Sequence, residues 1–285
     1  MKKIVMLMVV SALGFSGALF ADDKDHDDDN EVCVDVMAAI KGDSGASGYN
    51  VLKTALEDAQ DTVNGGFNLE MWATVVATDG TVCAVTKTGD ELNDQWLGSR
   101  VISAQKANTA IAFSLPDLAL STANLWAPTQ PGGSLFGLQF SNPVDTEVAY
   151  AGESSDFGTE VTDNASGGDP MVGKRIGGVN VFGGGLALYN ADGLIGAIGV
   201  SGDSSCADHN IAWRVRHALE LDYVPGGVNS DGSDNIIFDL KAGKGSSESF
   251  SPSGFGHPVC TGEANITVNA GMVANNPIRS AEEES

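Results

Sequence analysis

The sequence is poor in basic residues. Its 285 residues include 15 lysines and arginines against 38 aspartates and glutamates, which gives a formal net charge of −23 at pH 7. Proteins bind nucleic acid and anionic lipid by neutralising phosphates with lysine and arginine. The composition therefore excludes a nucleic-acid partner and adhesion to an anionic lipid surface, and it favours a well-solvated protein without naming a partner.

The common catalytic motifs are absent as well. The sequence contains no HExxH and no P-loop, and its run GGVNVFGGG lacks the GxGxxG spacing of a dinucleotide site. A nucleophile elbow, G-x-S-x-G, begins at Gly199 but fails at position 203, which is aspartate. The polar run 229–234 lacks the glutamate that closes an EF-hand loop, which indicates a turn. We therefore expect a binding protein more than an enzyme.

Long apolar runs are confined to the first 21 residues. Lys2 and Lys3 precede an uncharged run from 4 to 21, which predicts a secretory signal peptide (1–21) cut after Ala21. The alternative is an uncleaved anchor, but the run is short for a span of about 20 residues. Residues 22–31 then predict an acidic, flexible leader. We expect a periplasmic or secreted protein with no membrane insertion after cleavage.

Cysteine is scarce, and the four that occur lie beyond this apolar run. An even number of cysteines in an exported chain favours disulfides, with three possible pairings. We favour Cys33–Cys83 and Cys206–Cys260, the pairings closest in sequence. A four-cysteine zinc site is the alternative, but no CxxC spacing supports it.

Apolar periodicity predicts helices and two β-hairpins. One hairpin joins 71–77 to 81–85 through an Asp-Gly turn, and the other joins 186–189 to 194–200. Helices are expected at 33–40, 52–63, 95–113 and 206–221. In the third helix Arg100 and Lys106 lie off the apolar face, and the fourth begins at the capping pattern Ser205-x-x-Asp208. This order predicts an α+β fold, an antiparallel sheet with helices packed on it.

Two segments show no clear pattern. Residues 114–178 are rich in Gly, Pro, Ser and Asp, and so long a connection is unusual unless it is functional or a lid. Residues 225–285 predict a loop-rich extension with one strand at 236–238 and a disordered end at 281–285.

Three stretches, WATVVATDGTVCAV, SRVISAQKANTAIAF and GGGLALYNADGLIGAIGVSGDSSCADHNIAWRVRHAL, resemble the GlcG/HbpS family of haem-binding proteins. Its members share a hairpin with a D-G turn, an alanine-rich helix with a basic residue, and a G-A-I-G-V-S-G strand that leads into a closing helix. The resemblance spans roughly residues 50–220. We expect a GlcG/HbpS-like domain over 32–224, with a long insertion at 114–178.

The resemblance implies a profilin-like sandwich with an antiparallel sheet of about five strands, a homo-oligomer, and haem or a related tetrapyrrole as ligand. Some members carry an acidic iron-binding pair at positions that fall near Ile102 and Gln105. Neither residue is acidic, so the resemblance does not carry that iron-related property over. No metal is assigned.

Two rows of side chains follow the helix at 206–220. One row holds Ile211, Val215 and Leu219, and the other holds His209, Trp213 and His217. The rows are offset by two residues, or about 200°, so they lie on opposite faces. We expect the aliphatic row to face the core, and the His-Trp-His row to face a groove, a neighbouring subunit or solvent.

Imidazole ligates haem iron and an indole stacks on a porphyrin edge, so His209, Trp213 and His217 are candidate haem-binding residues. The alternative is that both histidines are surface residues, or pair with carboxylates such as Asp203 and Asp222. The two histidines are about 12 Å apart along the helix, so they cannot both ligate one iron.

His257 is a further candidate, because a Cys206–Cys260 disulfide brings it near this helix. The glycines at 183–185, 196 and 199 offer a flat surface for a macrocycle at the sheet–helix interface. Close packing of a helix on the sheet is the alternative.

The first functional hypothesis is an exported haem-binding protein. The alternatives are an enzyme or accessory factor acting on a small oxygenated metabolite, with 114–178 as its lid, and a protein that uses the sheet only for assembly.

Overall fold

The computed structural model describes residues 28–162, 167–242, 249–260 and 263–279. The predicted signal peptide (1–21) and the predicted disordered end (281–285) lie outside the described residues. Helix α1 (Asp28–Lys41) begins within the segment predicted as a leader. No helix in the described ranges is long and apolar enough to cross a membrane.

A four-stranded antiparallel sheet forms the centre of the fold, with the strand order β2-β1-β4-β3. Its strands are β1 (Trp72–Ala77), β2 (Val82–Lys87), β3 (Gly185–Asn190) and β4 (Gly193–Ser201). Both predicted hairpins and the α+β class are confirmed. The short β5 (Lys241–Ala242) and β6 (Ser249–Phe250) pair separately.

The count of about five strands was one too high for the described part of this sheet. The strand expected at 236–238 does not form. The Ile236 N–H donates to the side-chain oxygen of Asn235 at 2.8 Å and to His209 Nε2 at 3.2 Å rather than to a neighbouring strand. Residue 236 packs instead beside Cys206 as part of a small apolar cluster.

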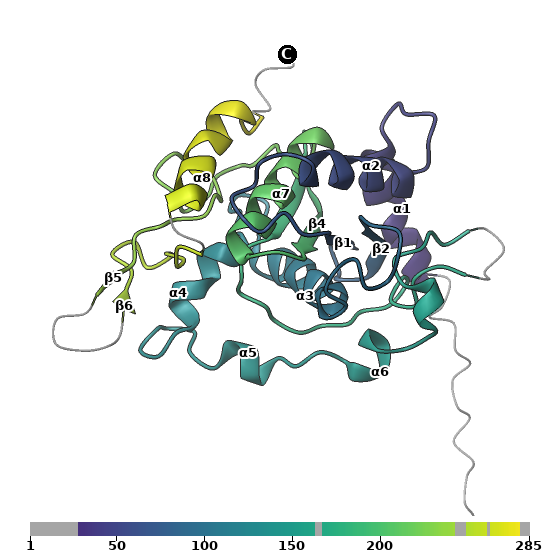
Figure 1. Ribbon diagram of the computed structural model, residues 1–285, viewed down its shortest axis with the longest axis horizontal. Coiled ribbons are helices and arrows are strands. Elements are labelled where there is room, and N and C mark those ends of the chain that lie inside the picture. The colour runs from purple at the N-terminus through teal and green to yellow at the C-terminus, as the bar shows by residue number, and fades with distance from the viewer. Residues whose placement is uncertain (1–27, 163–166, 243–248, 261–262, 280–285) are drawn as a thin grey trace, which may run out of the picture.

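Helices cover both faces of the sheet (Figure 1). Helix α3 (Gly98–Phe113) packs on one face, and α1, α2 (Gly48–Gln60) and α7 (Ser205–Ala218) pack on the other. Along β1, Ala73 and Val75 join the α2–α7 side, while Trp72 and Val76 join the α3 side. The sheet is therefore buried on both faces, and α7 is one of its covering helices.

The segment 114–178 forms short helices, and part of it joins the apolar cluster on the α3 side of the sheet. They are η1 (Thr122–Leu125), α4 (Trp126–Thr129), α5 (Leu138–Ser141), α6 (Thr146–Ala149) and η2 (Ser154–Asp156). Arg100 of α3 anchors the segment by donating to Asp169 at 2.7 Å and to the Ala149 carbonyl at 3.0 Å. Figure 1 shows α4, α5 and α6 one after another beside α3.

The last helix, α8 (Glu263–Asn275), lies beside α7 (Figure 1). Its residue Met272 joins the same core cluster as α7. The extension after residue 225 is thus part of the folded body near α7, and it decides what surrounds that helix.

Candidate functional site

Helix α7 carries three of the four predicted binding residues. It begins at Ser205, the residue predicted as the cap, because the N-cap is Ser204, whose side chain accepts from the Ala207 N–H. Asp208 in the first turn accepts from the Asp203 N–H at 2.8 Å. A carboxylate in this position favours the start of a helix.

The two rows along α7 are both largely buried. Ile211 and Val215 lie in the core, as predicted. His209 and Trp213 are 0% and 1% exposed, so the expectation that they face a groove, a subunit or solvent was wrong. The segment around Asn235 and helix α8 covers them, and the Trp213 indole N–H donates to the Asn276 carbonyl at 2.9 Å.

His209 sits in a buried network of amides. Its Nε2 lies 3.1 Å from the Asn235 side-chain oxygen, which also accepts from the Asn269 amide at 2.8 Å. Its Nδ1 is buried and has no hydrogen-bond partner. Burial lowers the pKa of His209 to about 3, so the ring is neutral at physiological pH.

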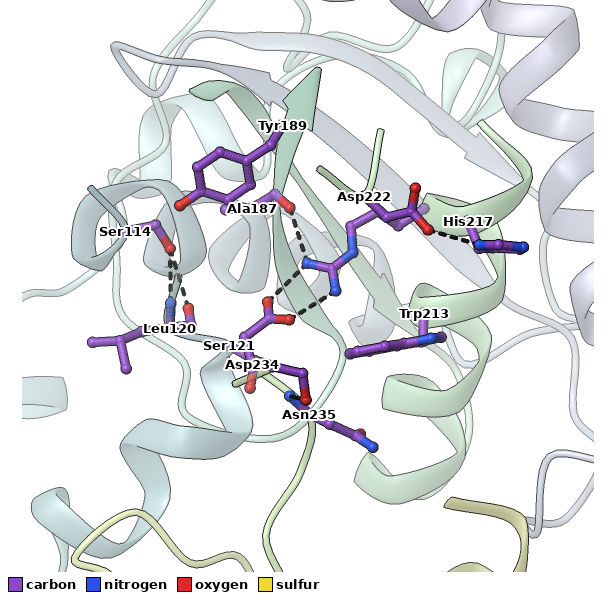
Figure 2. A network of polar contacts seen from close by, with 12 residues as sticks. Ser114, Leu120, Ser121, Ala187, Tyr189, Trp213, His217, Asp222, Asp234 and Asn235 are labelled. Atoms are coloured by element: carbon purple, nitrogen blue, oxygen red, sulfur yellow. Dashed lines mark hydrogen bonds and ion pairs between the residues drawn. The ribbon is translucent and has the colours of Figure 1, made fainter. Parts of the chain in front are cut away.

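Arg216, further along α7, forms a buried ion pair with Asp234. The Arg216 guanidinium donates to both oxygens of Asp234, at 2.8 and 2.7 Å, and to the Ala187 carbonyl at 3.2 Å. In Figure 2 dashed lines join the Asp234 carboxylate and the Ala187 carbonyl to one guanidinium group. No sequence pattern indicated this pair, because Asp234 lies 18 residues after Arg216 and outside the helix. An arginine on a helix is also usually solvated.

His217 lies at the C-terminal end of α7, in contact with Asp222 (Figure 2). Its Nδ1 is 2.7 Å from Asp222 Oδ2, and its side chain is 28% exposed. Arg279 holds the same carboxylate through its other oxygen and donates to the His217 carbonyl at 3.3 Å. The pairing of His217 with Asp222 is the alternative weighed from the sequence, and Arg279 is a partner that the sequence did not indicate.

A groove of about 440 Å³ begins at this cluster. Its walls include Tyr189, Tyr223, Val224, Ile278 and Arg279. Arg279 therefore links the groove to the Asp222–His217 pair. Asn190 and Asp192 also line the groove, so the walls combine aromatic and aliphatic groups with an anion and a cation.

His257 lies at the opposite end of α7, as the Cys206–Cys260 pairing predicted. Both predicted disulfides are present in the structure, Cys206–Cys260 and the pairing of residues 33 and 83. His257 is 1% exposed, its ring centroid lies 6.2 Å from that of Trp126, and Nδ1 is 2.8 Å from the Pro258 carbonyl. Burial lowers the pKa of His257 to about 4.

The glycine face of the sheet has no room for a macrocycle. A Cβ on Gly199 would lie 1.9 Å from the Ser103 carbonyl oxygen, and one on Gly185 would lie 2.5 Å from that of Lys106. Both oxygens belong to α3, whose backbone therefore fills the surface directly. The prediction of a ligand at the sheet–helix interface was wrong, and close helix-on-sheet packing is the reason for these glycines.

Lys106, expected off the apolar face of its helix, is buried in this same interface. Its ammonium group lies 2.7 Å from Asp208 and 2.9 Å from the Val200 carbonyl. Burial raises the pKa of Asp208 to about 6 and lowers the pKa of Lys106. The pair joins α3 to α7; the sequence indicated Lys106 as a residue off the apolar face and Asp208 as a capping residue, but not their contact.

A family model described as haem degrading protein HbpS-like matches residues 49–216. This range is more than half of the chain and runs from α2 into α7. The chain belongs to the HbpS-like family. His209 and Trp213 lie inside the matched range, whereas His217, Asp222 and His257 follow it.

Two solved structures resemble the chain. Protein ORFY of Klebsiella pneumoniae is 21% identical, with a TM-score of 0.38, over 59% of this chain and 84% of that one. A PduOC:heme complex is 24% identical, with a TM-score of 0.39, over 59% of this chain and 88% of the other. No curated protein matches the chain.

The predicted histidines differ in how well they fit haem iron. His217 has Nδ1 bound to a carboxylate and a partly exposed side chain, which leaves Nε2 free for a ligand. His209 and His257 each have a buried ring nitrogen without a partner, but both rings are enclosed. The imidazole of His217 is therefore accessible to a haem iron in this structure. The imidazoles of His209 and His257 become accessible only if the segments that bury them move.

Proposed function

We propose that this chain is a haem-binding protein and that His217 is its iron ligand. The main observation behind this proposal is the 2.7 Å contact between His217 Nδ1 and Asp222, together with the partial exposure of the imidazole. Membership of the HbpS-like family supports the choice of haem over other ligands. The PduOC:heme complex among the similar structures is a protein with bound haem.

A carboxylate behind a histidine suits iron ligation. A metal-binding histidine usually donates its second ring N–H to a carboxylate or a carbonyl, which fixes the tautomer and makes the free nitrogen a better donor. Asp222 occupies that position for His217, and Arg279 fixes Asp222 in turn. Bound haem supplies an iron centre whose chemistry depends on its axial ligand and surroundings.

The neighbouring groove offers some apolar surface to a flat ligand. Tyr223 and Ile278 line it, and the Arg279 guanidinium, which is paired with Asp222 and Glu220, lies at its edge. His209 and Trp213 then act as positioning residues, since their contacts fix α7 beneath the extension.

A haemin titration of the purified full chain tests the proposal, with the Soret absorption as readout. We expect saturable binding at one haemin per chain and a shifted Soret maximum that His217→Ala abolishes. Asp222→Asn should weaken binding by about 10–100-fold, the usual cost of losing an outer-shell partner. His209→Gln and His257→Ala are the matched histidine controls.

Two outcomes are decisive. A featureless titration at micromolar protein overturns haem binding. Saturable binding that His217→Ala leaves unchanged, but that His257→Ala or His209→Gln removes, overturns the ligand assignment and transfers it to that histidine.

The proposal includes export and self-association. Two disulfides support an oxidising compartment. Exposed aromatic side chains along the inserted segment, Phe136, Phe140 and Tyr150, support contacts with another copy. Cell fractionation followed by light scattering of the purified protein tests both: a cytoplasmic location contradicts export, and a monomeric mass contradicts self-association.

A further inference from the structure

The second disulfide is adjacent to a buried histidine. Ligand atoms of Cys206, His257 and Cys260 all lie within 4.8 Å of one another, and His257 Nδ1 is 4.0 Å from Cys206 Sγ. Cys206 belongs to the first turn of α7, whereas the other two residues come from the extension. Two thiolates and an imidazole form a ligand set that binds zinc in proteins.

His257 provides an independent sign that the site suits a ligand. Its ring is 1% exposed, and its Nε2 is buried without a hydrogen-bond partner. A buried polar atom without a partner costs free energy, and such atoms are few in folded proteins. Nδ1, the nitrogen 4.0 Å from Cys206 Sγ, lies 2.8 Å from the Pro258 carbonyl, so the unused bonding capacity of this imidazole is at Nε2.

The groups around the sulfurs favour negative charge. The Cys206 N–H donates to Cys260 Sγ at 3.1 Å, and the Ser205 hydroxyl lies 3.3 Å from the same sulfur. Both groups stand at the N-terminus of α7, where the helix dipole stabilises anions. A Cys260 thiolate would find two hydrogen-bond donors in place.

We propose that reduction of the Cys206–Cys260 disulfide opens a Cys₂His site for a soft divalent cation of the zinc type. An external dithiol supplies two electrons and two protons, so that the S–S bond becomes two thiols and the dithiol becomes a disulfide. The cation then displaces both thiol protons and binds the two sulfurs and His257.

Little movement is required. Zinc–sulfur and zinc–nitrogen bonds of about 2.3 and 2.0 Å in a tetrahedral site place ligand atoms about 3.5 Å apart. The atoms already lie within 4.8 Å, so the main change is the separation of the two sulfurs after their bond breaks. Three protein ligands leave a fourth position for water or another molecule.

The other disulfide serves as the internal control. Among the described residues, the set at 206, 257 and 260 is the one group of three potential ligands this close together. Cys33 and Cys83 are joined in the same way, and no histidine of the described ranges completes such a group of three with them. Reduction should therefore create a cation site at one disulfide and not at the other.

The inference goes beyond the proposed haem function and does not depend on it. His217 lies eleven residues after Cys206, or about 16 Å along α7, and contributes nothing to this set. Haemin binding is measured on the oxidised protein and cation binding on the reduced protein. If one proposal fails, the other is therefore not affected.

The test uses cobalt(II) alone as a spectroscopic probe on the purified full chain, oxidised or reduced by a dithiol that is then removed without air. We expect the reduced chain to bind one cobalt ion, with a thiolate-to-cobalt charge-transfer band and intense ligand-field bands, and the oxidised chain to show neither. Cys33→Ser/Cys83→Ser should keep the bands, and Cys206→Ser/Cys260→Ser should lose them. His257→Ala should weaken cobalt binding at least about tenfold, because even outer-shell changes cost that much.

Cobalt bands in the Cys206→Ser/Cys260→Ser variant, or an affinity that His257→Ala leaves unchanged, overturn the proposal. Far-ultraviolet circular dichroism is recorded in parallel, in case reduction alone unfolds the chain. Refolding on addition of cobalt supports the site, and a reduced chain that stays unfolded or spectroscopically silent with cobalt overturns it.

Discussion

Acid should destabilise this protein through His209, whose ring is held neutral in the folded state. The side chain is fully buried, and burial lowers its pKa to about 3. In the unfolded chain a histidine has a pKa near 6.5. Because the pKa is lower in the folded state, below about pH 6.5 the unfolded state binds a proton that the native state does not bind. The free energy of unfolding therefore decreases as the pH is lowered.

The size of the effect follows from the two pKa values. Each pH unit below the unfolded pKa costs about 1.4 kcal/mol until the folded pKa is reached. Lowering the pH from 7 to 5 should therefore remove about 2 kcal/mol from the free energy of unfolding through this one side chain. Such a loss is a sizeable part of the stability of an ordinary domain.

Other groups titrate in the same range with the opposite sign. Asp208, whose pKa burial raises to about 6, takes up a proton in the native state before the unfolded state does. Its contribution to stability therefore grows as the pH falls through that value. His257, whose pKa burial lowers to about 4, acts with the same sign as His209. The total pH dependence mixes these groups, so the effect of His209 must be measured as a difference between two proteins.

Urea denaturation of the wild type and of His209→Gln at a series of pH values gives this difference. Glutamine retains an amide that can hydrogen-bond to Asn235, whose side-chain oxygen lies 3.1 Å from His209 Nε2, but it does not titrate. The wild type should lose about 2 kcal/mol more than the variant between pH 7 and 5. Trp213→Phe, a buried change on the same helix, should give a difference that does not depend on pH. A His209→Gln difference that stays constant to within about 0.5 kcal/mol would refute the reasoning.

Two further predictions concern packing around the sheet. Arg216→Met leaves Asp234 buried without its partner and should lower the free energy of unfolding by about 3–5 kcal/mol, whereas Arg216→Met/Asp234→Leu should recover most of that loss in urea denaturation. Gly199→Ala places a methyl group 1.9 Å from the Ser103 carbonyl oxygen and should lower the free energy of unfolding by about 1–3 kcal/mol. Gly226→Ala is the control, because its new methyl group would lie 3.8 Å from its nearest neighbour. Equal losses in the two variants would contradict the packing argument.

The sequence by itself determined the local architecture. Alternating apolar residues and Asp-Gly turns predicted both hairpins, and periodicity at three and four residues predicted the main helices, because these patterns report on neighbours within one element. The disulfide pairing followed from sequence separation, with Cys33–Cys83 and Cys206–Cys260 present in the structure. The aliphatic face of α7 also lies in the core as its spacing predicted.

Only the tertiary structure decided what covers each face of a helix. The row with His209 and Trp213 is polar and aromatic enough to suit a groove, yet the extension after residue 225 buries it. Lys106 is buried because Asp208, 102 residues away in sequence, neutralises it. Helical periodicity records which side chains share a face, but whether water, a ligand or protein meets that face depends on contacts between distant segments. The same reason explains why Asp222 and Arg279 around His217 were recognised as one cluster only in the folded chain.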